Sequence, residues 1–70
     1  MTAQEFEAMV RARGLPASAS REALRQMLVE GMPVAQAARA VGCTYAAAYR
    51  ALEKHRAWED KIARAGYTRA

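Results

Sequence analysis

The fold is decided by residues 33–52, PVAQAARAVGCTYAAAYRAL, where small, apolar and turn-forming residues stand at helical spacing. Pro33 suits the first turn of a helix, because the backbone N–H that proline lacks would have no partner there. Four apolar residues follow at intervals of three and four and predict one buried helical face: Val34, Ala37, Ala38 and Val41. Gly42 comes next and can adopt the left-handed backbone conformation that a sharp interhelical turn requires.

A second helix is predicted to begin after Thr44, whose hydroxyl is a good N-cap. Its inward residues are Ala47, Ala48, Ala51 and Leu52, and its outward residues are Tyr45, Ala46, Tyr49, Arg50 and Glu53. Because Ala38 faces Ala48 and Ala51, the two helices can cross closely. The pattern predicts a helix-turn-helix. An ordinary helical hairpin is the alternative, since Ala supplies 18 of the 70 residues and some matches arise by chance.

Two further helices are predicted before this segment. Thr2 and Glu5 have the spacing of a capping box, and the helix that they open carries Phe6, Met9 and Val10 on one face. It ends at Gly14, and Pro16 follows. The next helix is capped by Ser18 or Ser20 and runs to about Glu30, where Gly31 closes it. Its inward residues are Ala23, Leu24, Met27 and Leu28.

The segment after Leu52 has two interpretations. Apolar positions continue at intervals of three or four to Gly66, through His55, Trp58, Ile62 and Ala65. Either the second helix of the pair is unusually long, or a break between Ala51 and Arg56 separates it from a fifth helix. We predict the break. The fold class is therefore all-α, a small bundle of four to five helices that contains a helix-turn-helix, in one domain spanning residues 1–70.

Length and composition exclude several classes of function. A chain of 70 residues leaves little room for an internal active site, and no constellation of acid, base, metal ligand or phosphate loop is visible, so no enzyme, cofactor or small-molecule ligand is expected. Cys43 is the single cysteine, which excludes an internal disulfide and a cysteine-only metal site. There is no apolar stretch of membrane-spanning length and no secretory signal, so we expect a cytoplasmic location.

The excess of positive over negative charge is confined to the second half of the chain. Residues 1–35 carry four Arg and four Glu, whereas residues 36–70 carry seven Lys or Arg and three Asp or Glu. All of the net charge of +4 thus falls in the half that holds the helix pair. A basic face is the footprint of a phosphate-backbone binder, although solvated helix faces also carry such residues.

The order of these features resembles the DNA-binding domain of the KorA/TrfB-type plasmid transcriptional repressors. The resemblance rests on the Thr-capped helix with Phe6, on Leu28-Val-Glu-Gly31-Met-Pro33, on the helix pair, and on Trp58-Glu59-Asp60-Lys61 followed by Gly66-Tyr67. It implies an all-helical domain that binds palindromic operators as a dimer and represses plasmid promoters. The family continues into a separate C-terminal dimerisation region that has no counterpart here. The stretch before Trp58 is also one residue shorter.

The outward positions of the second helix are the predicted DNA contacts. Base contacts are assigned to Tyr45, Ala46, Tyr49 and Arg50. Arg50 can bridge guanine O6 and N7, and the alternative is a phosphate contact or a solvated charge. Tyr45 packs on a thymine methyl or bonds a phosphate, or else it belongs to the edge of the core. Phosphate contacts are assigned to Gln36, Arg39, Thr44, Lys54 and Arg56.

Two hypotheses on partners follow. The first is a repressor that binds double-stranded DNA as a homodimer through Trp58 and Ile62, which are either that dimer interface or the closing layer of the monomer core. The second is a protein-interaction module of plasmid or phage origin that binds its partner through the C-terminal helix. His55 has no second ligand for a metal and is predicted to lie at the surface or an interface.

Overall fold

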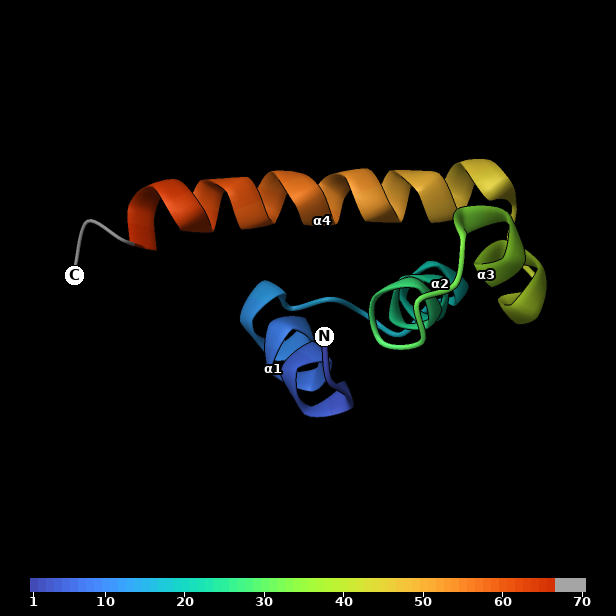
Figure 1. Cartoon of the computed structure of the whole chain (residues 1–70), viewed down its shortest axis with the longest axis horizontal. Coiled ribbons are helices and arrows are strands. Elements are labelled where there is room, and N and C mark those ends of the chain that lie inside the picture. Colours follow the sequence, from blue (N-terminus) through green and yellow to red (C-terminus); the bar gives the residue numbers. More distant parts are fainter. Residues whose placement is uncertain (67–70) are drawn as a thin grey trace.

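The structure, a computed structural model, describes residues 1–66 and consists of four helices over that range. They are α1 (Ala3–Arg13), α2 (Ala19–Leu28), α3 (Val34–Val41) and α4 (Tyr45–Gly66), and no strand occurs among the described residues. Figure 1 shows α4 running along one side of the molecule, with the three shorter helices on the other. The all-α fold predicted from the sequence is confirmed, with four helices. The long α4 gives the molecule its elongated shape, 40 × 21 × 21 Å.

The helix boundaries follow the capping residues. The N–H of Thr2 donates to Glu5 Oε1 at 2.8 Å and the N–H of Glu5 donates to Thr2 Oγ1 at 3.0 Å, which confirms the capping box. Gly14 ends α1 in the left-handed conformation, with φ of 65°. Ser18, and not Ser20, caps α2 through the N–H of Arg21. That helix ends at Leu28, two residues before the predicted end.

The core is formed at the meeting of α2 with the other three helices. Phe6, Met9 and Val10 contribute from α1, as predicted. The remaining buried apolar residues are Ala23, Leu24, Met27, Ala37, Ala38 and Ala48. Both α3 and α4 pack closely on α2, because alanine at their contacts lets the backbones approach. The inward faces predicted for residues 34–52 are therefore confirmed except at Ala47, which is only partly buried and lies outside the core cluster. Pro33 is the N-cap of α3 and precedes its first turn.

The predicted break between Ala51 and Arg56 is wrong, and so is the fifth helix. The helix α4 is continuous over 22 residues. Positions 45–65 contain no Gly or Pro and are rich in strong helix formers, so nothing in the backbone favours a break. Ion pairs between successive turns, Arg56 with Glu53 and Arg64 with Asp60, add further support for the helix.

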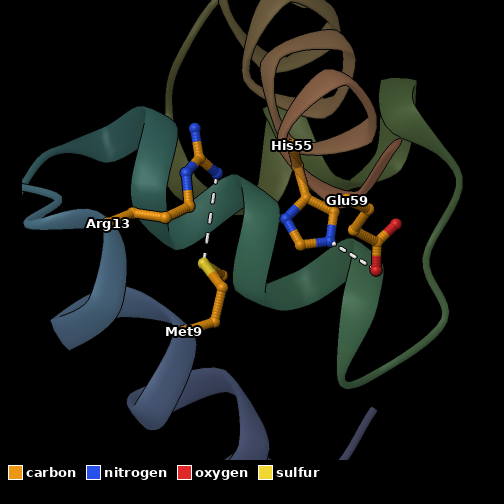
Figure 2. Close-up of polar contacts among 4 residues, drawn as sticks. All are labelled: Met9, Arg13, His55 and Glu59. Atoms are coloured by element: carbon orange, nitrogen blue, oxygen red, sulfur yellow. Dashed lines mark hydrogen bonds and ion pairs between the residues drawn. The ribbon is translucent and has the colours of Figure 1, made fainter. Parts of the chain in front are cut away.

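The prediction for His55 is also wrong. Its side chain is only 1% exposed, and Figure 2 shows the ring projecting from α4 into the helical body. The position belongs to the same face of α4 as the buried Ala48, two turns earlier, and a continuous helix keeps both residues turned toward α2. His55 is thus buried because α4 continues unbroken through this position.

Candidate nucleic-acid interface

The relative position of α3 and α4 is fixed by a turn of three residues. Gly42 adopts the left-handed conformation with φ of 75°, as predicted, and its N–H and that of Cys43 both donate to the carbonyl of Ala38. Thr44 then caps α4, since its Oγ1 accepts the N–H of Ala47 at 3.1 Å. Ala38 and Ala48 are buried behind the turn. This arrangement holds the first turns of α4 with one face outward.

That outward face holds the four residues predicted to contact bases. Tyr45, Ala46, Tyr49 and Arg50 are all exposed, the two tyrosine side chains by 57% and 44%. The tyrosine rings lie parallel to each other, with 6.1 Å between centroids and 9° between planes. Ala46 presents only a methyl group beside them. The first two turns of α4 therefore form an open face of stacked rings, a small residue and one guanidinium.

The cations of α4 fall into two groups. Arg56 Nη1 lies 3.3 Å from Glu53 Oε2, and Arg64 Nη2 lies 3.1 Å from Asp60 Oδ2. Within residues 1–66, Arg50, Lys54 and Lys61 form no ion pair. At about 100° per residue these three fall within an arc of about 40° on α4. The helix thus carries a stripe of unneutralised charge along one flank, and we name these three residues the basic stripe.

The predicted phosphate contacts divide between the two flanks of α4 and the neighbouring α3. Gln36 and Arg39 are exposed on α3, and Thr44 is exposed in the turn. The Thr44 hydroxyl accepts a hydrogen bond and keeps its own proton to donate. Lys54 lies in the basic stripe, whereas Arg56 lies on the opposite flank, near the tyrosines, and is paired with Glu53.

Lys61 is a candidate phosphate contact that the sequence prediction missed. Its helical neighbours at three and four residues are Ala57, Trp58, Arg64 and Ala65, none of which is acidic. Lys54 likewise has no acidic residue at these distances, whereas Arg56 and Arg64 do. Because such neighbours meet on a helix surface, this spacing could have identified Lys54 and Lys61 as unpaired, but not Arg50, which has Glu53 three residues on.

Trp58 and Ile62 differ in their surroundings. Trp58 is half-buried and packs against the core, with the guanidinium of Arg13 over its ring at 5.8 Å from the centroid. Ile62, one turn later, is 48% exposed, and residues 59–65 are exposed throughout. Trp58 therefore contributes to the core of the monomer, and Ile62 lies on the part of α4 that extends past it.

His55 is held without a hydrogen bond. Its Nε2 lies 3.2 Å from Glu59 Oε2, the contact drawn in Figure 2, but the alignment is not that of a hydrogen bond. Neither ring nitrogen has a hydrogen-bond partner. In the same region the guanidinium of Arg13 makes a long contact of 4.0 Å with the sulfur of Met9. The interior beneath α4 thus contains a polar ring that its surroundings do not satisfy.

The candidate site is an exposed surface of α3 and α4 and not an enclosed pocket. No cavity is found among residues 1–66, and no group of three or more His, Cys, Asp or Glu side chains in that range could hold a metal ion. None of the four helices is long and apolar enough to cross a membrane. Comparison of the chain with known protein families, with curated proteins and with solved structures gives no match.

Proposed function

We propose that this chain is a sequence-specific DNA-binding regulator, a repressor that binds a short palindromic operator as a dimer. In this proposal α3 and α4 form a helix-turn-helix, and the first turns of α4 enter the major groove. The observation that carries the proposal is the basic stripe beside the open face of α4. Cations that form no ion pair on an exposed helix are what a polyanion would neutralise.

The proposed roles follow from position. Ala46 lets the helix approach the base edges, and Arg50 is placed to donate two hydrogen bonds to guanine O6 and N7. Lys54 and Lys61, further along the flank, would contact the phosphates of one strand. Gln36, Arg39 and Thr44 would contact the backbone where α3 and the turn face it. The resemblance to the KorA/TrfB-type repressors supports the same arrangement, with repression of a plasmid promoter as the outcome.

The experiment is selection of bound sequences from random duplex DNA, followed by measurement of affinity for the selected site at several salt concentrations. We expect a preferred inverted repeat. Arg39, Lys54 and Lys61 supply three phosphate contacts per copy, so the plot of log affinity against log salt should have a slope of about −3 for each bound copy. Equal recovery of all sequences, or a slope near zero, would contradict the proposal.

A second candidate function is a protein-interaction module that uses the end of α4. The observation in its favour is Ile62, which is 48% exposed on a segment that is exposed throughout. An apolar protein interface changes little with salt, whereas DNA binding by counterion release weakens steeply. Salt dependence of the interaction therefore separates the two functions.

A further inference from the structure

The Tyr45–Tyr49 pair lies outside the hydrophobic core of the monomer. The two rings stack on each other and lie outside the core, and within residues 1–66 neither hydroxyl forms a hydrogen bond. Two adjacent exposed aromatic rings are a large apolar surface for a protein of 70 residues. Such a surface indicates a partner with an apolar group to present.

The surroundings of the pair restrict the chemistry of that partner. The unpaired Arg50 and Lys54 lie on the other flank of the same helix, about 100 to 180° around its axis from the rings. Ala46 lies between the two flanks and leaves the space above them open. The partner must therefore place an apolar group against the rings while its anionic parts meet the basic stripe.

Duplex DNA meets both requirements in one place. Its major groove is wide enough for an α-helix, is bounded by phosphates, and exposes a single kind of apolar substituent, the 5-methyl group of thymine. The ring centroids are 6.1 Å apart, and successive base pairs are separated by about 3.4 Å. Rings whose separation runs along the duplex axis would therefore span between one and two base-pair steps and meet different base pairs.

We propose that Tyr45 and Tyr49 act as one preformed unit that recognises the 5-methyl groups of two thymines in each half-site. This inference rests on the proposed DNA-binding function and adds the chemical group that is read. Because each ring already restricts the rotation of the other, little side-chain freedom is lost when the methyl groups pack against them.

The experiment replaces each thymine of the selected duplex, one at a time, with deoxyuridine, which lacks only the methyl group. Wild-type protein should lose affinity about fourfold at each of two positions per half-site, since a buried CH₂-sized group contributes about 0.8 kcal/mol and 1.4 kcal/mol is tenfold. In Tyr45→Ala and in Tyr49→Ala one of the two uracil effects should vanish. Tyr45→Phe and Tyr49→Phe keep the ring and should keep the effect.

Each result bears on the inference. Both tyrosines are exposed, so the variants should melt as wild type does, which is checked first. Sequence-specific binding that ignores every uracil substitution would overturn the methyl readout and leave the proposed function intact. Tighter binding to the single strand than to the duplex would overturn it too, by assigning the rings to base stacking. Absence of any preferred duplex would overturn both proposals together.

Discussion

At the scale of single residues, the cations of α4 differ in whether a neighbouring carboxylate already neutralises them. Arg64 and Lys61 lie one turn apart and both are exposed, but Arg64 is paired with Asp60 and Lys61 is free. A protein cation that binds a phosphate releases a counterion from the DNA. A cation that is already paired with a carboxylate releases less, because its charge is partly neutralised before it binds. The same charge change at these two positions should therefore have different effects on DNA binding.

We expect Lys61→Ala to weaken binding to all duplex sequences alike and to reduce the steepness of the salt dependence by about 1 per copy. Arg64→Ala removes the same charge and serves as the matched control, with a much smaller change in slope. The measurement is affinity for the selected site and for a random duplex, each at several salt concentrations. Equal slopes for the two variants would show that the basic stripe does not contact phosphate.

His55 provides a prediction on stability. A buried polar group without a hydrogen bond costs about 1 to 3 kcal/mol, and both nitrogens of this ring are in that situation. His55→Leu replaces the ring by an apolar side chain of similar volume, so at neutral pH we expect the free energy of unfolding to rise by about 1 kcal/mol.

Urea denaturation measures the effect of His55→Leu. Glu59→Gln is the companion variant, because it alters the one charged group within 3.2 Å of the ring and leaves the ring in place. A His55→Leu protein less stable than wild type by more than 1 kcal/mol would show that the imidazole makes favourable contacts that outweigh its unpaired nitrogens.

The outward residues of the candidate site were largely predictable, whereas the choice of Glu53 between Arg50 and Arg56 was not. Tyr45, Ala46, Tyr49 and Arg50 face outward because a period of 3.6 residues leaves them opposite the alanines that pack on α3. The prediction that Arg56 contacts phosphate assumed that an exposed cation forms no ion pair within the protein. The pairing of Arg56 with Glu53 depends on the helix continuing through residue 56, which the predicted break denied.

At the scale of the elements, α1 depends on its cap. The Thr2 N–H that donates to the carboxylate lowers the pKa of Glu5 below its ordinary value of 4.5. A lowered pKa in the folded state means that the interaction stabilises the protein above the ordinary value and is lost as pH falls through the lowered one. The carboxylate is fully exposed, so the effect is small.

We therefore expect Glu5→Gln to melt at a lower temperature than wild type near neutral pH, and the difference to shrink between about pH 5 and about pH 3. Glu7→Gln is the matched control, since Glu7 is exposed on the same helix and takes no part in the cap. Thermal unfolding followed by circular dichroism over this pH range measures both variants. A pH dependence that is the same in all three proteins would assign the low-pH loss of stability to other carboxylates.

The turn between α3 and α4 depends on Gly42. A Cβ at this position would meet nothing within 4 Å, so the cost of substitution is in the backbone and not in packing. Gly42→Val forces a β-branched residue to φ of 75° and should lower the free energy of unfolding by about 1 to 2 kcal/mol. Gly42→Asn should cost less, because Asn tolerates the left-handed region. Equal costs for Val and Asn would contradict a left-handed turn.

Element boundaries followed from local chemistry, whereas the predicted length of α4 was wrong. Thr2, Ser18 and Thr44 each accept a backbone N–H at the start of a helix. Gly14 and Gly42 each end a helix with positive φ. Single residues therefore predict these boundaries. Within α4, Ala48, His55 and Trp58 also face the other helices, so tertiary contacts add to the local helix preference as far as Trp58. These contacts join distant segments of the chain and were not predictable from the local pattern, whereas the absence of Gly and Pro from positions 45–65 was visible in the sequence and was given too little weight.

At the scale of the whole molecule, the exposed end of α4 is the surface that a second copy would contact in the proposed dimer. A dimer on a palindrome needs a self-complementary surface, and Ile62 is exposed where α4 extends beyond the body. Trp58 is already engaged with the core and with Arg13, so a variant of Trp58 would disturb the monomer as well. Ile62→Lys is the cleaner test.

We expect wild-type protein to bind its operator as two copies and Ile62→Lys to bind as one, with a loss of affinity for the full palindrome and little change for an isolated half-site. Mass measurement on operator DNA and thermal melting of the free variant check this outcome. Binding of wild type as a single copy, or of Ile62→Lys as two, would exclude Ile62 from a dimer contact.

The unbroken course of α4 also makes it a rigid rod. Its 22 residues extend for about 33 Å, and no hinge separates the face that carries the tyrosines from the turns that carry Ile62. A partner that binds at Ile62 therefore also determines how the face with Tyr45 and Tyr49 is rotated about the helix axis. Adding one residue to the rod would rotate one end against the other by about 100°. If the proposed DNA-binding function holds, the orientation of the tyrosine face on DNA is fixed by a contact made at Ile62, about 25 Å along the same helix.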